Sequence, residues 1–74
     1  MNNGIWNQIK GNWKQFTGNV QDKWGELTGD DIDEINGERK VLEGKIQERY
    51  GVAQQEASRQ IDEWAAELKD KVNS

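Results

Sequence analysis

The chain of 74 residues contains no cysteine, no histidine and no proline. Without cysteine, neither a disulfide nor a thiolate metal site can stabilise so short a chain. Without histidine and cysteine, the commonest general base and the thiolate nucleophile of enzymes are both missing. Without proline, glycine is the only strong interruption of secondary structure. The composition therefore argues against an enzyme, a cofactor-binding protein and a disulfide-rich secreted scaffold.

Aliphatic residues and phenylalanine are also scarce, because Leu, Ile, Val and Phe supply only 14 of the 74 residues while charged residues supply 32%. This composition lies close to that of disordered chains. The net charge is only −4, however, and each of the four tryptophans can bury about 150–250 Å². We therefore expect residues 1–74 to form one small domain with a thin aromatic core. Its expected stability is marginal, about 5 kcal/mol.

No apolar run approaches the roughly 18 residues of a membrane span, and no charged leader followed by an apolar segment is recognisable. The expected location is therefore cytoplasmic, with no constitutive membrane association. The first part of the chain has aromatic residues and lysines, but its polar positions are mainly Asn, Gln and Gly rather than the dense basic residues that anionic lipids attract.

Glycines and apolar residues share one register along the chain. Seven of the eight glycines keep a spacing of seven residues, interrupted once: Gly4, Gly11, Gly18, Gly25, Gly37, Gly44 and Gly51. The early apolar residues step by three or four: Trp6, Ile9, Trp13, Phe16, Val20, Trp24 and Leu27. This spacing places them on one helical face. It predicts a helix over about 5–27 that ends at the pair Thr28 and Gly29.

The sequence also contains an internal duplication. Residues 11–36 align with residues 37–62 at an offset of 26, a self-similarity that bears on the fold. Identical residues are Gly11 and Gly37, Lys14 and Lys40, Gly18 and Gly44, Gln21 and Gln47, Gly25 and Gly51, and Ile35 and Ile61. Each copy reads as a helix, a glycine-marked turn and a second helix. The predicted fold is therefore all-α, with about four helices arranged as two tandem helical hairpins in an open array or small bundle.

The remaining helices follow from capping residues. Thr28, Asp30 and Asp31 offer caps for a short helix over 31–36, and Asn36 offers one for a helix ending at Gly51. The last helix is expected over about 53–70. The predicted core is Trp13, Phe16, Val20, Leu42, Ile46, Tyr50, Ile61 and Trp64. Further inward-facing residues are expected at Val41, Ala57, Leu68 and Val72, whereas the pairs Arg39 with Glu43 and Glu67 with Lys71 are expected on solvent faces.

The early glycines lie on the helix face opposite the apolar stripe, where residues point away from the core and usually make no packing contacts. Glycine costs about 0.5–1 kcal/mol relative to alanine inside a helix. One interpretation is that these glycines break or bend the helices and leave a soft fold. The other is that Gly11, Gly18 and Gly44 form a smooth contact face for another helix, from this chain or a second copy. Replacing Gly11 and Gly18 by alanine separates the two, because only the second interpretation predicts loss of folding or of self-association.

Candidate catalytic and metal-binding residues have little support. The hydroxyl side chains considered as nucleophiles, none with an evident base, are Thr17, Thr28, Ser58 and Ser74. The acidic run contains Asp30, Asp31, Asp33 and Glu34, and its expected role is turn and cap chemistry. A calcium loop that starts at Asp31 would place Ile35 where an oxygen ligand is needed. We therefore expect no catalytic residue, no metal site and no cofactor.

Nucleic-acid binding is not expected either. Residues 30–74 carry seven basic and twelve acidic side chains, a net charge of −5, and residues 1–29 carry three and two, a net charge of +1. A surface that binds phosphates should be distinctly positive. Lys10, Lys14 and Lys23 lie close in sequence to aromatic residues, but an aromatic stripe at helical spacing is more often core than a stacking platform.

Two segments resemble a known family. GNWKQFTGNVQDKWGELTGDD at 11–31 and GKIQERYG at 44–51 resemble the signatures of the CsbD-like family of small bacterial stress-response proteins, and the resemblance covers about residues 4–64. It implies an all-helical fold of about four helices in two open hairpins, and cytoplasmic expression in general stress or stationary phase. It transfers no catalytic residue. Thr17 and Asn19 stand where family members often carry lysine, so this chain is less basic there.

Two functional hypotheses follow. The first is a non-enzymatic stress-response protein that acts as a hydrophilic protectant, favoured by a mean hydropathy of −1.12 and eight glycines. The second is a protein–protein interaction module, or a homo-oligomer, that uses an aromatic or glycine helix face. It would be marked by an exposed patch, because Trp6, Trp24 and Trp64 are not all expected to be central in so small a fold.

Overall fold

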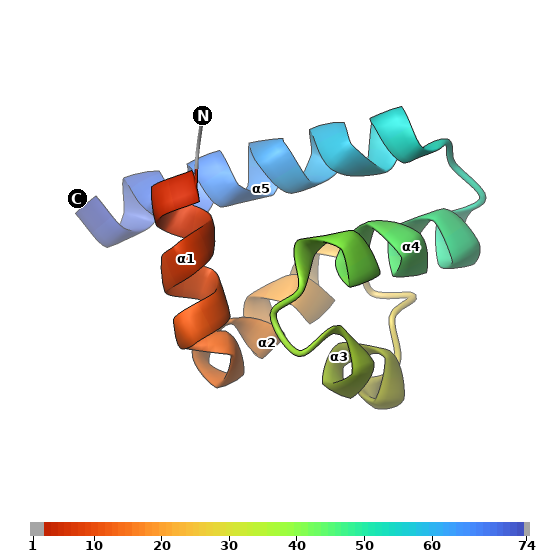
Figure 1. The fold of residues 1–74 in the computed structure, drawn as a ribbon, viewed down its shortest axis with the longest axis horizontal. Coiled ribbons are helices and arrows are strands. Elements are labelled where there is room, and N and C mark those ends of the chain that lie inside the picture. The colour runs from red at the N-terminus through yellow and green to blue at the C-terminus, as the bar shows by residue number, and fades with distance from the viewer. Residues whose placement is uncertain (1–2, 74) are drawn as a thin grey trace.

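The computed structural model describes the backbone of residues 3–73 and the side chains of residues 4–70. This part of the chain forms five helices and no strand: α1 (Asn3–Gly11), α2 (Trp13–Lys23), α3 (Gly29–Ile35), α4 (Arg39–Tyr50) and α5 (Gln54–Asn73). The predicted all-α class is confirmed. The helices pack into a body of 33 × 23 × 18 Å in which α4 and α5 run antiparallel and α1 crosses near the C-terminal half of α5 (Figure 1).

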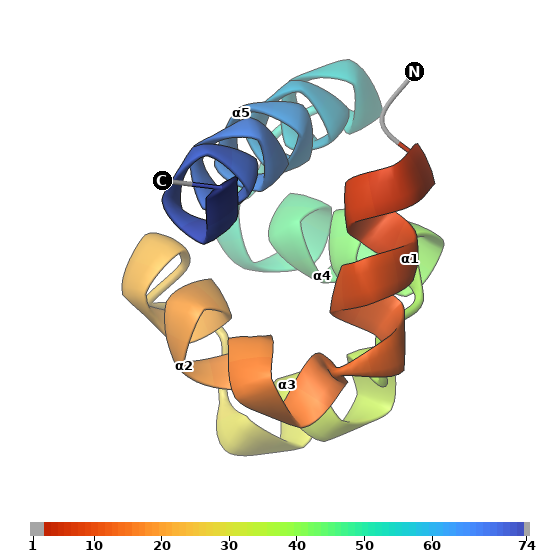
Figure 2. The same ribbon diagram turned by 90° about the vertical axis from the view of Figure 1, so that its left-hand side faces the viewer.

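The chain turns a corner between α1 and α2, so the predicted single helix over 5–27 is wrong. Asn12 leaves helical geometry with φ −124° and ψ 39°, and its side chain makes no cap hydrogen bond to α2. The corner lets α1 run along one side of the molecule while α2 lies on another (Figure 2). Ile9 of α1 and Val20 of α2 are both fully buried in one continuous core, which the two helices reach from either side of the corner. Tertiary packing therefore breaks the helix, and the number of helices rises from about four to five.

The second of these helices also ends earlier than predicted, at Lys23. Thr28, expected to end it, is instead the N-cap of α3: its hydroxyl accepts a hydrogen bond from the Asp31 N–H at 3.1 Å, and the Asp31 carboxylate accepts one from the Thr28 N–H at 3.1 Å. This is a capping box, with Asp in the third helical position. Capping by Thr28 was predicted, but α3 begins two residues before its predicted start at 31.

Asn36 also has a different role from the predicted one. It does not begin the next helix but ends α3, in the left-handed conformation with φ 46°. Gly37 follows with φ 83°, a region that glycine adopts without steric cost. Glu38 then occupies the N-cap position of α4. The left-handed pair reverses the chain so that α3 packs against α4.

The core gathers side chains from all five helices and from the loop after α2. The buried apolar residues are Ile5, Ile9, Trp13, Phe16, Val20, Trp24, Leu27, Ile32, Ile35, Leu42, Ile46, Ala57, Ile61, Trp64, Ala65 and Leu68. They include seven of the eight predicted core positions. Val72 lies outside the side chains that the structure describes. The core is continuous, so the chain buries its apolar stripe by folding back on itself.

Tyr50 is the exception among the predicted core residues, because its side chain is 39% exposed. A position eight residues after Leu42 is rotated by about 80° around a helix with 3.6 residues per turn. The ring therefore leaves the face that buries Leu42 and Ile46. The Tyr50 hydroxyl accepts a hydrogen bond from the Glu26 N–H at 3.1 Å and so holds the loop between α2 and α3. Val41, also expected inside, is 37% exposed.

The glycines of the predicted contact face have open space around them. A Cβ added at Gly11, Gly18 or Gly44 would meet no atom within 4 Å, apart from its own helix backbone and chain neighbours. No helix of the described chain therefore packs closely on this face, and that form of the contact interpretation is wrong. Contact with a second copy remains a prediction.

We expect Gly18→Ala to raise the free energy of unfolding by about 0.5–1 kcal/mol, because alanine loses less backbone entropy in a regular helix. Thermal unfolding followed by circular dichroism measures the change. Gly37→Ala is the control with the opposite sign, since Gly37 has φ 83° and its Cβ would lie 3.2 Å from the Lys10 Cα. A lower melting temperature for Gly18→Ala would contradict this account.

Candidate functional site

Three tryptophans meet where α1, α5 and the loop after α2 come together. The Trp64 ring lies edge-on to Trp6, with ring centroids 6.4 Å apart, and edge-on to Trp24, with centroids 5.4 Å apart. Trp24 is 1% exposed, Trp64 is 3% exposed and Trp6 is half-buried against the core. The Trp24 indole N–H donates to the Gln60 side-chain oxygen at 2.8 Å. The exposed tryptophan patch that would mark an interaction module is therefore absent from the described surface, because these rings pack on one another.

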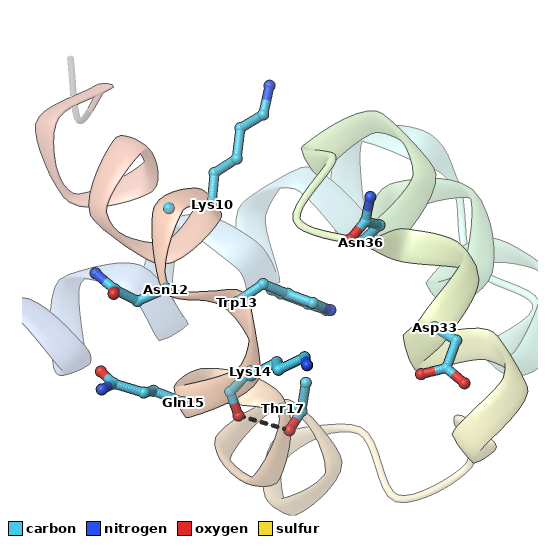
Figure 3. Close-up of a pocket in the computed structure, with 9 residues that line it drawn as sticks. Lys10, Asn12, Trp13, Lys14, Gln15, Thr17, Asp33 and Asn36 are labelled. Atoms are coloured by element: carbon cyan, nitrogen blue, oxygen red, sulfur yellow. Dashed lines mark hydrogen bonds between the residues drawn. The ribbon is translucent and has the colours of Figure 1, made fainter.

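A groove of about 490 Å³ opens between the α1–α2 corner and α3 (Figure 3). The residues that line it are Lys10, Gly11, Asn12, Trp13, Lys14, Gln15, Thr17, Asp33 and Asn36. Figure 3 shows Trp13 extending from α2 toward α3, with Asn12 and Gln15 directed away from it. The Trp13 indole N–H donates to the Ile32 carbonyl at 3.2 Å, so the ring closes the inner side of the groove.

The groove carries charges of both signs. Lys10 is paired with Glu38, with Nζ and Oε1 2.8 Å apart, and Lys14 shares the groove with Asp33. The other polar lining groups are amides and the Thr17 hydroxyl. Such groups exchange hydrogen bonds with water or with neutral polar molecules, whereas a phosphate-binding surface needs an excess of positive charge. Within residues 4–70, no three Asp, Glu, His or Cys side chains gather as metal ligands would.

The hydroxyl side chains that were considered as nucleophiles have structural partners. Thr17 donates to the Lys14 carbonyl at 3.1 Å. Thr28 accepts from the Asp31 N–H, and Ser58 accepts from the Arg39 guanidinium at 3.0 Å. Ser74 lies outside the described residues. None of the three described hydroxyls has the hydrogen bond to a general base that activates a nucleophile.

A charged cluster joins α3 to α4 around Asp31, which is only 3% exposed. Arg49 holds the Asp31 carboxylate at both oxygens, with Nε–Oδ2 2.9 Å and Nη2–Oδ1 3.1 Å. Lys45 lies 3.4 Å from Asp31 and also pairs with Glu34. The bidentate bond from Arg49, then the Thr28 N–H, hold the pKa of Asp31 well below its usual range. Pairing raises the pKa of Arg49 chiefly through Asp31, and that of Lys45 chiefly through Glu34.

A second cluster joins α4 to α5 around Arg39. Its guanidinium contacts Asp62 at 2.7 Å, the Ser58 carbonyl at 3.3 Å and Glu43 at 3.4 Å. The pair of Arg39 with Glu43 was expected on a solvent face, but the Glu43 side chain is only 12% exposed because it lies near α5. Lys71 of the other expected pair lies outside the described side chains. Sequence reasoning missed the contacts that link residues about 20 positions apart, since no local spacing signals them.

The geometry defines a class: a small helical protein whose polar groups serve the packing of its own helices. No helix within residues 3–73 has the length and apolar character needed to cross a membrane. The sequence profile of the CsbD-like family matches residues 7–59. The chain belongs to this family, and with it to the small bacterial proteins of the stress-response type.

Several curated proteins are similar over most of their length. The UPF0337 protein RPA4217 of Rhodopseudomonas palustris is 56% identical over 64 residues, which cover 86% of this chain and 97% of that protein. The UPF0337 protein YjbJ of Escherichia coli is 52% identical over 54 residues, covering 73% and 78%. The UPF0337 protein NE2439 of Nitrosomonas europaea is 43% identical over 60 residues, covering 81% and 64%. No solved structure matches the chain.

We expect Asp31→Asn to lower the melting temperature at pH 7, because the neutral amide loses the charge-assisted bonds to Arg49. The folded state lowers the pKa of Asp31, so this carboxylate stabilises the fold above its unfolded pKa of about 4 and progressively less as the pH falls below it. The variant should therefore lose less stability than the unmodified chain between about pH 4 and pH 2.

Asp33→Asn is the matched control, since Asp33 is exposed on the same helix. Thermal unfolding at several pH values compares the two variants. Equal melting temperatures at pH 7 would show that the cluster around Asp31 does not hold α3 to α4.

Proposed function

We propose that this chain is a non-enzymatic cytoplasmic protectant, which acts by its abundance around labile proteins rather than by turning over a substrate. The proposal extends family membership to a mechanism. The observation that carries it is the hydrated surface: among residues 4–70, the large apolar side chains more than a third exposed are Val41 and Tyr50. The Tyr50 hydroxyl is itself hydrogen-bonded to the backbone.

The polar surface supports high solubility. Charged side chains pair across helices and along them, as in the pairs of Arg59 with Glu56 and Glu63 on α5. The net charge of −4 opposes non-specific aggregation, since like charges on neighbouring copies repel one another. A protein with these properties can reach a high concentration without presenting a large apolar patch that promotes aggregation.

The same polar surface supplies the hydrogen-bonding groups through which the chain would protect other proteins. As water is lost, side chains such as Asn12, Gln15 and Lys14 around the groove offer hydrogen bonds to neighbouring protein surfaces in place of water. Exposed glycines in α2 and α4 lower the stability of these helices and make no packing contacts that would offset the loss. The helices can therefore change conformation at a low cost in free energy. Both features act without a specific partner and without catalysis.

The test is the recovery of a labile soluble enzyme after drying or freezing in the presence of the chain. We expect more recovered activity than with an equal mass of an unrelated small protein of similar net charge. Equal recovery with the two proteins would contradict the proposal.

Val41→Gln is the matched variant. It distinguishes protection by the hydrated surface from protection by apolar binding of the labile enzyme to this chain. It removes an exposed apolar side chain from α4 and keeps a residue that favours helix. We expect unchanged protection. Loss of protection would instead favour the alternative function, an interaction module that docks on proteins through this face.

A further inference from the structure

The corner between α1 and α2 occurs at a dipeptide that the chain also uses inside a helix. Gly11 and Asn12 form the corner, whereas Gly18 and Asn19 lie within α2 seven residues later. Both glycines have open space around them. The local sequence is therefore compatible with either conformation, and the corner at Asn12 is imposed by contacts made elsewhere.

Those contacts are the ones that α1 makes with the rest of the chain. Ile5 and Ile9 are buried in the core, and Trp6 packs on Trp64 of α5. Lys10 pairs with Glu38, and its backbone lies against Gly37 at the turn before α4. The Trp6 contact joins α1 to α5, and the Lys10 contacts join it to the turn at 36–38, so any α1 of the same sequence satisfies them equally well.

The connection to α2 is very short. The Asn12 N–H donates to the Gln8 carbonyl and closes α1, and the Asn12 carbonyl accepts from the Gln15 N–H and opens α2. Only one residue between the two helices is non-helical. Returning Asn12 to helical angles would join α1 and α2 into one helix with a continuous apolar stripe from Trp6 to Val20. That helix would carry the apolar face of α1 away from its own α5.

We propose that two copies of this chain exchange α1. In the exchanged dimer, α1 and α2 of each copy form one straight helix, and α1 of each copy packs on α5 and on the turn at 36–38 of the other. A second copy is the occupant that fits, because it alone presents the same residues in the same spacing. Short connections between packed elements are the sites at which such swapping occurs, and exchange of an identical element conserves its contacts. This inference does not depend on the protectant function.

The ion pair of Lys10 with Glu38 provides a direct test, because its two residues lie on opposite sides of the exchange. Unlabelled and ¹⁵N-labelled chains are mixed, unfolded, refolded together at high concentration and treated with a zero-length carbodiimide cross-linker. We expect Lys10–Glu38 cross-links that combine one labelled and one unlabelled peptide. The pair of Lys45 with Glu34, between α3 and α4, is the internal control and should give only same-chain cross-links. Mixed cross-links at neither pair, or at both, would overturn the proposal.

A matched pair of variants tests the role of the corner. Gly11→Ala with Asn12→Ala favours a straight helix through the corner, whereas Gly18→Ala with Asn19→Ala makes the same changes inside α2. Light scattering after size-exclusion chromatography should show a higher dimer fraction for the first variant at equal concentration. Equal dimer fractions, or monomers in both cases, would overturn the proposal.

Discussion

The rest of the structure depends on the edge contacts that Trp64 makes with Trp6 and Trp24. These rings join α1, the loop after α2 and α5, three segments that are far apart in the sequence. Ten buried Ile, Leu and Val side chains of the described residues fill much of the core, but each tryptophan brings about 150–250 Å² of surface, more than any of them. The corner at Asn12 follows from this requirement, since it is what brings Trp6 back to α5. The polar clusters around Asp31 and Arg39 then fix α3 and α5 against α4.

The periodic features were predictable because they depend on local geometry. The spacing of Trp13, Phe16 and Val20 predicted the buried face of α2, and the preference of threonine for helix starts predicted capping by Thr28. Features decided by distant contacts were not predictable. The dipeptide at Gly11 gives no sign of a corner, because the same dipeptide is helical at Gly18. The outward turn of Tyr50 depends on small rotations accumulated along α4, and the bond of Arg49 to Asp31 links residues 18 positions apart.

In the candidate site, the described polar side chains are used to position the helices. The hydroxyl groups of Thr17, Thr28 and Ser58 all serve local geometry, and the groove beside Trp13 balances lysine against aspartate. What the chain presents to its surroundings is therefore mainly hydrated polar surface, on a fold made soft by exposed helical glycines. The proposed protectant function relies on this hydrated surface, and the proposed exchange of α1 relies on the low helix stability at the exposed glycines.

The chain folds back at Asn12, and the indole of Trp6 thereby meets that of Trp64. Nuclear magnetic resonance of the dilute chain measures this most directly, through nuclear Overhauser effects between the two rings and through the backbone shifts of residue 12. We expect ring-to-ring effects together with non-helical shifts at Asn12. Helical shifts that continue without interruption from α1 into α2, with no contact between the two rings, would contradict this arrangement.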